Sequence, residues 1–270
     1  MIIALDVGNS TVTMGQVRHG DVTSSRSVPT SQVDTVGELE RELDELLGGD
    51  GSSLEDVTEL VSASVVPAVT AALATLAQRR EARLLIADHT NIPVPIRVDH
   101  PAAVGDDRLV NALAAARLYG KPAIVVDLGT ATTVDVVAAD GAFIGGAIAA
   151  GAGLGLDALA TRTAQLPRVP LVMPPRAIGR DTVAAMQSGA VIGHIGLVGE
   201  LVRAISAELA LDGGNPPKVV LTGGLSNSDW AQAVPGVDAI DPLLTLRGLA
   251  ILYAEVGYAE VGRTQSVAQA

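Results

Sequence analysis

A short phrase occurs twice in this chain and constrains its fold more than any other feature. The first copy reads Asp6-Val7-Gly8-Asn9-Ser10-Thr11, and the second reads Asp127-Leu128-Gly129-Thr130-Ala131-Thr132-Thr133. Each copy directly follows an apolar run that is typical of a buried strand, at residues 2–5 and 123–126. The chain therefore places a carboxylate, a glycine and small polar residues at the ends of two matching strands. Such strand ends are suited to holding a nucleotide's phosphates and their metal.

The position of the two copies indicates two related halves rather than one barrel, because they lie nearly half the chain apart. Each copy leads into an alternating run, at residues 11–17 and 133–137, so each predicts a hairpin. We expect two α/β domains, at residues 1–118 and 119–258, and a flexible tail at 259–270. Further patterns predict helices over 36–47, 68–83, 107–119 and 182–209, and strands over 60–66, 84–87 and 219–221.

Composition narrows the range of functions. Of the 270 residues 48% are hydrophobic but only 2% are aromatic, which favours sheets built from aliphatic side chains and covered by helices. The net charge of -12 argues against a nucleic-acid partner or an anionic membrane surface. The absence of cysteine excludes disulfides and thiolate chemistry, and no signal-peptide pattern begins the chain, so we expect a cytoplasmic protein. Two apolar stretches, 141–156 and 184–199, are too short to predict transmembrane helices.

Several other functional signatures do not occur in the sequence. There is no P-loop, no Gly-x-Gly-x-x-Gly that opens a helix after a strand, and no Gly-x-Ser-x-Gly. The histidines are scattered without metal-ligand spacing, so we expect surface or loop positions for all of them: His19, His89, His100 and His194.

A second candidate group lies at the start of the helix predicted from residue 107. The Asp107 carboxylate could accept a proton from a substrate hydroxyl, and the Arg108 guanidinium could pair with a substrate carboxylate. Aspartate is also common in a first helical turn, and arginine often only extends along a surface. From spacing alone, a catalytic and a structural interpretation both stay open.

Several motifs occur in the order in which they occur in the type III pantothenate kinases, and from Met1 to about Tyr258 the chain resembles this family. The resemblance implies two ribonuclease-H-like, actin-like ATPase domains, each a mixed sheet flanked by helices, with a cleft between them. Besides the repeated phrase, the motifs are Val104-Gly105-Asp106-Asp107-Arg108, Gly145-Gly146-Ala147-Ile148, Thr163-Ala164-Gln165-Leu166-Pro167, Ile178-Gly179-Arg180-Asp181-Thr182 and Thr222-Gly223-Gly224.

The family resemblance also implies a function. It implies ATP-dependent phosphorylation of pantothenate to 4'-phosphopantothenate, the first step of coenzyme A biosynthesis, by a cytoplasmic homodimer. Asp107 would be the general base, and Asp127 would bind a monovalent cation, K⁺ or NH₄⁺. Mg²⁺ would reach Asp6 through ATP. The residues implied to bind ATP are Asp6, Val7, Gly8, Asn9, Ser10, Thr11, Val12, Thr13 and Thr130, and those implied to bind pantothenate are Gly105, Asp106, Asp107, Arg108 and Thr182.

The chain departs from the family pattern at a few positions. Asp106 stands where alanine is usual, Val98 where tyrosine is usual, Ala150 in place of proline and Asp181 in place of asparagine. Asp106 adds a negative charge beside the implied base, near an anionic substrate, and like charges raise a carboxyl pKa. Two other functions therefore stay open: a non-catalytic regulatory or accessory protein of the same fold, and a kinase for another small hydroxylated substrate.

Overall fold

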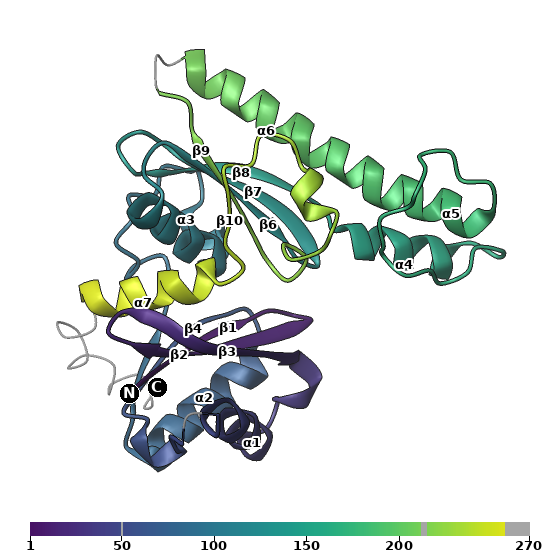
Figure 1. Cartoon of the computed structure of the whole chain (residues 1–270). Helices are drawn as coiled ribbons and strands as arrows, with labels where there is room; N and C mark the ends of the chain where they lie inside the picture. Colours follow the sequence, from purple (N-terminus) through teal and green to yellow (C-terminus); the bar gives the residue numbers. More distant parts are fainter. Residues whose placement is uncertain (50, 212–214, 257–270) are drawn as a thin grey trace. The chain divides into compact units, whose positions relative to one another are not determined.

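The computed structural model of this chain describes residues 1–49, 51–211 and 215–256. These form two compact units, Met1–Ala114 with residues 243–256, and Ala115–Pro242. Each unit holds a five-stranded mixed sheet with helices packed on it (Figure 1). The predicted flexible tail at 259–270 lies outside the described residues.

The sheet of the first unit is built around β1 (Ile2–Val7). On one side β1 pairs antiparallel with β2 (Thr11–Arg18), which pairs antiparallel with β3 (Asp21–Pro29). On the other side β1 pairs parallel with β4 (Glu59–Ser64), and β4 pairs parallel with β5 (Arg83–Ile86). The strand order is β3-β2-β1-β4-β5, and the predicted first hairpin is its centre.

The sheet of the second unit repeats this plan around β6 (Ala123–Leu128). Its antiparallel neighbours are β7 (Ala131–Val137) and then β8 (Phe143–Ala150), and its parallel neighbours are β9 (Lys218–Thr222) and β10 (Ala239–Ile240). The order β10-β9-β6-β7-β8 matches that of the first sheet. Even the register irregularities correspond, at Gln16/Val17 and at Val136/Val137. The repeated phrase therefore marks a repeated supersecondary unit.

The helices of the first unit cover both faces of its sheet. Helix α1 (Val36–Leu47) begins with a capping box between Thr35 and Glu38, and it packs beside α2 (Pro67–Arg80). Figure 1 shows these two helices on one face and α7 (Leu244–Val256) on the other. Buried aliphatic side chains fill the space between α1, α2 and the sheet, among them Ile3, Leu5, Val12, Leu43 and Leu73.

Helix α7 joins the first unit although it is last in the sequence. A Cβ on Gly248 would lie 2.5 Å from the carbonyl oxygen of Val110, so the helix backbones are in close contact at this point. The buried Thr245 hydroxyl donates a 2.8 Å hydrogen bond to Asn111 Oδ1 on α3 (Asp106–Leu118). The predicted ranges 1–118 and 119–258 follow chain order alone and differ from the observed units. The difference arises because the contacts of α7 with α3 join residues that are far apart in the sequence.

The helices of the second unit begin with α4 (Ala152–Arg162). Helix α5 (Thr182–Gln187) continues through a π-helical segment, Ser188–Ile192, into α6 (Gly193–Leu211). By length and composition alone, the continuous helix Thr182–Leu211 could cross a membrane, with 22% of its most apolar window buried. The apolar stretch 184–199 is too short to predict a transmembrane helix, but the helix that contains it is longer than the stretch itself.

Sequence patterns do not predict β3, β8 or α4. Strand β3 alternates exposed and half-buried polar residues at the sheet edge, and β8 contains Gly145 and Gly146, so neither carries a strong apolar signal. Helix α4 contains Gly153 and Gly155, which lower helix propensity. Tertiary packing, rather than local propensity, therefore determines that these three elements form.

Candidate active site

The first hairpin presents a three-residue turn that is held from one side by a threonine. Within the turn the Gly8 amide donates to the Thr11 carbonyl at 3.0 Å. The Thr30 amide donates to the Ser10 carbonyl at 3.1 Å, and the Thr30 hydroxyl donates to the Gly8 carbonyl at 2.7 Å. Asn9 and Ser10 are exposed. Sequence reasoning missed Thr30, and its position one residue beyond β3 gives no motif signal.

A row of polar side chains crosses the sheet beside this turn. Asp6 on β1 is directly opposite Thr13 on β2, and Thr13 is opposite Ser27 on β3. The Thr13 and Ser27 hydroxyls are 3.0 Å apart and share a hydrogen bond. Cross-strand partners point to the same face, so the half-buried Asp6 carboxylate has hydroxyls beside it. Val7 and Val12 are instead buried in the core, so only their backbone groups could contact a nucleotide.

The second hairpin has a shorter turn and a backbone support. The Gly129 amide donates to the Ala131 carbonyl at 3.0 Å, and the Gly151 amide donates to the Thr130 carbonyl at 3.0 Å. A Cβ on Gly151 would lie 2.5 Å from the carbonyl oxygen of Gly129. The start of α4 therefore touches the turn backbone, an approach that only glycine permits.

The Asp127 carboxylate of the second hairpin lies in a small cradle. Asp127 is opposite Thr133 on β7 and beside Thr222 on β9. Gly223 follows with φ +92°, and a Cβ there would collide with Asp127 Oδ1 and lie 2.7 Å from the Leu128 amide nitrogen. The Thr-Gly-Gly motif thus makes room for the Asp127 carboxylate, a role that the motif alone does not indicate.

The donor set around Asp127 fits a cation bound by oxygen. No group of three His, Cys, Asp or Glu side chains that could hold a metal ion exists among residues 1–49, 51–211 and 215–256. A cation at Asp127 would therefore use one carboxylate together with hydroxyl, carbonyl and phosphate oxygens. Oxygen ligands suit hard cations, so these residues fit the implied ion.

The third group of predicted site residues lies at the start of α3. Asp107 Oδ1 accepts a 2.9 Å hydrogen bond from the Arg108 amide. A Cβ on Gly105 would lie 2.5 Å from the same oxygen, so Gly105 leaves room for the Asp107 carboxylate. Asp107 and Arg108 are half-buried, and the helix N-terminus favours negative charge. The structure thus presents a fixed carboxylate and a neighbouring guanidinium.

Asp106 is half-buried rather than turned fully to solvent. Burial raises the pKa of Asp106, the carboxylates of Asp88 and Asp107 raise it further, and His89 lowers it in part. Asp88 itself accepts hydrogen bonds from the amides of Thr90 and Asn91, which fix its carboxylate. The like-charge effect expected of Asp106 is therefore present, and the contribution of Asp88 has no signal in the sequence.

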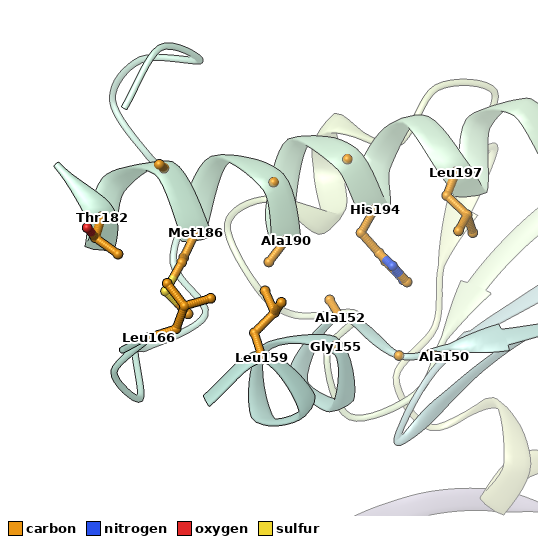
Figure 2. A pocket seen from close by; sticks show the side chains of 14 residues that line it. Ala150, Ala152, Gly155, Leu159, Leu166, Thr182, Met186, Ala190, His194 and Leu197 are labelled. Carbon is orange, nitrogen blue, oxygen red and sulfur yellow. The ribbon is translucent and has the colours of Figure 1, made fainter. Parts of the chain in front are cut away.

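Thr182 lies in the second unit, on a cavity of about 740 Å³ bounded by α4, α5 and α6 (Figure 2). The cavity extends from Thr182 to Gly151, which is hydrogen-bonded to the turn that carries Thr130. Asp181 caps α5, because its side chain accepts a 2.8 Å hydrogen bond from the Ala184 amide. Asparagine can also cap a helix, so the departure at Asp181 keeps this function.

His194 also lines this cavity, and the surface or loop position expected for it is wrong. It lies within α6, its exposed fraction is 6%, and its Nε2 is 2.9 Å from the Thr132 hydroxyl. The imidazole meets the Trp230 ring edge to face, with centroids 6.0 Å apart. The helical spacing Met186, Ala190, His194 places it on an inward face, a periodic signal that could have identified it.

Comparison with solved structures shows the class of fold. Over 94% of its length the chain resembles a structure described as a conserved putative Baf family transcriptional activator from Campylobacter jejuni, with a TM-score of 0.55, 17% identity and 98% of that chain covered. It also resembles the activator of the 2-hydroxyisocaproyl-CoA dehydratase from Clostridium difficile with bound ADPNP, with a TM-score of 0.52, 16% identity and 93% of that chain covered. The predicted two-domain, actin-like fold is confirmed.

The family within this class follows from the sequence. A family model described as type III pantothenate kinase matches residues 2–204. A type III pantothenate kinase from Moorella thermoacetica is 41% identical over 255 residues, which cover 94% of this chain and 98% of that protein. One from Thermomicrobium roseum is also 41% identical, over 94% of this chain and 96% of that protein. The chain therefore belongs to the type III pantothenate kinase family, as its motifs predict.

Proposed function

We propose that this chain phosphorylates pantothenate to 4'-phosphopantothenate with ATP, the first step of coenzyme A biosynthesis. The observation that carries this proposal is the Asp107 carboxylate at the start of α3, which Gly105 leaves room for and the Arg108 amide fixes. The chain belongs to this family and has two Asp-x-Gly hairpins. In this setting the Asp107 carboxylate is suited to accept the proton of the substrate hydroxyl that receives the phosphoryl group.

In the reaction, bound ATP supplies the phosphoryl group. Asp107 accepts the proton of the pantothenate hydroxyl, and Arg108 pairs with the pantothenate carboxylate. Gly105 and Asp106 line the same end of α3, and Thr182 completes the substrate contacts. The turn amides and hydroxyls of the first hairpin, with Asp6 and Thr130, orient the phosphates, because phosphoryl transfer depends mainly on positioning and charge stabilisation.

Two cations belong to this proposal. Asp6 would hold Mg²⁺ together with the ATP phosphates, and Asp127 would hold K⁺ or NH₄⁺ and so help to neutralise the phosphate charge. The cradle formed by Gly223 and the oxygen-rich surroundings of Asp127 support the second assignment. The expected result is a kinase activity that falls when K⁺ is replaced by Na⁺, measured at constant ionic strength.

We also propose that the enzyme is a cytoplasmic homodimer whose interface covers the outer side of the α4–α6 helices. Large apolar side chains are exposed on and near these helices, including Ile178 at 82% and Ile148 at 64%. A second copy of the chain would bury them, as dimer interfaces bury apolar surface. Sedimentation should give twice the chain mass, and Ile178→Glu should give a monomer.

The central experiment is a coupled assay with Mg-ATP, K⁺ and pantothenate, with the product identified by mass spectrometry. Asp107→Asn should lower kcat by at least about a hundredfold while the affinity for ATP stays unchanged. Asp44→Asn is the matched control, because Asp44 is an exposed aspartate on α1. A fully active Asp107→Asn variant would exclude Asp107 as the base.

The two alternative functions make different predictions in the same experiment. A non-catalytic regulatory protein would bind nucleotide without turnover, and a kinase for another substrate would consume ATP only with a different hydroxylated acceptor. Folded wild-type protein that yields no phosphopantothenate would overturn the proposed function in favour of one of these.

A further inference from the structure

We propose that His194 is a positioning residue for the second hairpin, and that it acts by holding the Thr132 hydroxyl from the side of α6. The two side chains meet at 2.9 Å, and Thr132 is only 1% exposed. Thr132 lies two residues beyond Thr130, so a fixed Thr132 restrains the turn that we assign to the nucleotide. This inference rests on the proposed function for that assignment.

The strand geometry explains how the contact reaches the turn. Thr132 on β7 is directly opposite Leu128 on β6, and side chains alternate between the two faces of a sheet. Leu128 packs in the core with Val191 and Val198 of the long helix, so Thr132 faces that helix as well. Asp127, one residue before Leu128, points to the opposite face. His194 therefore supports the hairpin from the side opposite to the Asp127 carboxylate.

The hydrogen bond distinguishes this role from simple core packing. Against Trp230, a phenyl ring would fill the same space as the imidazole, because the contact is edge to face at 6.0 Å. A phenyl ring would leave the buried Thr132 hydroxyl without its imidazole partner, and an unpaired buried hydroxyl is destabilising. Helix α6 also begins directly after the π-helical segment, a type of irregularity that often occurs at functional sites.

Burial favours the neutral form of the His194 imidazole. Burial lowers the pKa of His194 from its ordinary value of 6.5, and no charged group within the described part of the chain contributes to this shift. Figure 2 shows the ring pointing from α6 into the cavity, toward the end of β8. Asp135 is three residues from Thr132 on β7 and so lies on the other face of the sheet. The remaining titratable groups of the elements packed here are exposed: Asp157, Arg162, Asp229, Glu200, Arg203 and Glu208.

Protonation of His194 would weaken the support. In the neutral ring Nε2 either accepts from the Thr132 hydroxyl or donates to it, according to the tautomer. The imidazolium can only donate, and its charge would be buried against the Trp230 indole. A histidine whose folded pKa is depressed loses stability as pH falls below its unfolded value. The contribution of His194 should therefore be complete above about pH 7 and decline below pH 6.5.

The test uses nucleotide affinity, which is measured without pantothenate. His194→Phe and Thr132→Val should each raise the Kd for a non-hydrolysable ATP analogue about fivefold, the value of one hydrogen bond. The double variant should show no further increase, because both changes remove the same contact. Thr132→Ser should restore most of the affinity lost in Thr132→Val.

A second readout is specific to protonation. Trp230 is the only tryptophan in the chain, so its fluorescence reports the charge on His194. The wild-type emission should titrate below pH 6.5, and the His194→Phe emission should stay constant in that range. Unchanged nucleotide affinity in folded His194→Phe, or additive effects in the double variant, would overturn the inference. Wild-type protein that binds ATP but makes no phosphopantothenate would overturn only the proposed function.

Discussion

The two Asp-x-Gly hairpins begin alike and are supported differently. In the first, Asp6 pairs with Thr13 across the three-residue turn Gly8-Asn9-Ser10, whereas in the second Asp127 pairs with Thr133 across a turn one residue shorter. In both, the residue after the third strand donates its amide to a turn carbonyl. That residue is Thr30 in the first unit and Gly151 in the second.

This difference shows two ways to fix the same supersecondary structure. The first turn is held by a threonine side chain, whose hydroxyl adds a second bond to the Gly8 carbonyl. The second turn is enclosed by backbone, since Gly151 and Gly223 leave no room for a Cβ. A hydroxyl can be replaced at the loss of one hydrogen bond, but a close backbone approach cannot accept even one carbon. We therefore expect the second hairpin to be the more sensitive to substitution.

The largest expected effect is at Gly223. Gly223→Ala introduces a Cβ that collides with the Asp127 carboxylate, at a φ of +92° that alanine rarely adopts. The free energy of unfolding should fall by about 3 kcal/mol. Displacement of Asp127 should lower kcat/KM at least about a hundredfold. Chemical denaturation and the coupled assay measure these two effects.

Gly224→Ala is the matched control for this substitution. A Cβ on Gly224 meets no atom within 4 Å, so stability and activity should stay close to those of the wild type. Equal losses in the two variants would contradict the argument from close backbone approach.

A second prediction separates the two units by their response to acid. On β3 of the first unit, Arg26 pairs with the buried Glu42 at 2.8 Å and with Glu45, whereas the corresponding strand β8 carries no charged residue. Burial alone would raise the pKa of Glu42, but hydrogen bonds from Arg26 and Arg41 outweigh it and lower the pKa. Stability from this pair is therefore present above the unfolded pKa and lost as pH falls through the folded pKa.

Glu42→Gln should thus reduce the free energy of unfolding by about 2 kcal/mol at pH 7, and by less as pH falls below about 4.5. Glu55→Gln, an exposed glutamate of the same unit, is the control. Denaturation curves between pH 3.5 and 8 measure the difference. A loss in Glu42→Gln that is the same at every pH would show that the ion pair is not its cause.

A smaller effect is expected at the support of the first hairpin. Thr30→Val removes the 2.7 Å bond to the Gly8 carbonyl and keeps the backbone bond to Ser10. Stability should fall by about 1 kcal/mol, and the KM for ATP should rise about fivefold. Thr30→Ser, which keeps the hydroxyl, should recover the ATP affinity. If Thr30→Val is as damaging as Gly223→Ala, the contrast between the two hairpins is wrong.

Local sequence signals predicted the elements that are specified locally. Helix α1 has the predicted bounds because Thr35 and Glu38 form its cap, and both hairpins lie where the repeated phrase places them. The family motifs also led to the confirmed fold. These features depend on residues that are close together in the chain.

The remaining features depend on contacts between residues that are far apart in the chain. Strand β3 is defined by pairing with β2, and α7 joins the first unit through Gly248 and Thr245, more than a hundred residues from their partners on α3. The site residues missed by sequence reasoning, Thr30 and His194, bond to turn or strand positions with which they share no motif. No local propensity encodes such pairings.

The smallest effect concerns the residue that departs from the family beside the implied base. Burial and the neighbouring carboxylates raise the pKa of Asp106, so ionised Asp106 weakens the folded state and repels an anionic substrate. A carboxyl with a raised folded pKa costs stability as pH rises through its unfolded value, and the cost persists above the folded pKa. Asp106→Asn should therefore be slightly more stable than the wild type at pH 7, and equal to it in acid.

The same substitution should lower the KM for pantothenate about twofold to threefold at pH 7, with kcat and the KM for ATP unchanged. Lowering the ionic strength should enlarge the difference, because charge repulsion is less screened. Asp99→Asn, an exposed position that precedes α3, is the control. A higher KM in Asp106→Asn would mean that the Asp106 carboxylate binds the substrate directly, and the departure from alanine would then be part of substrate recognition.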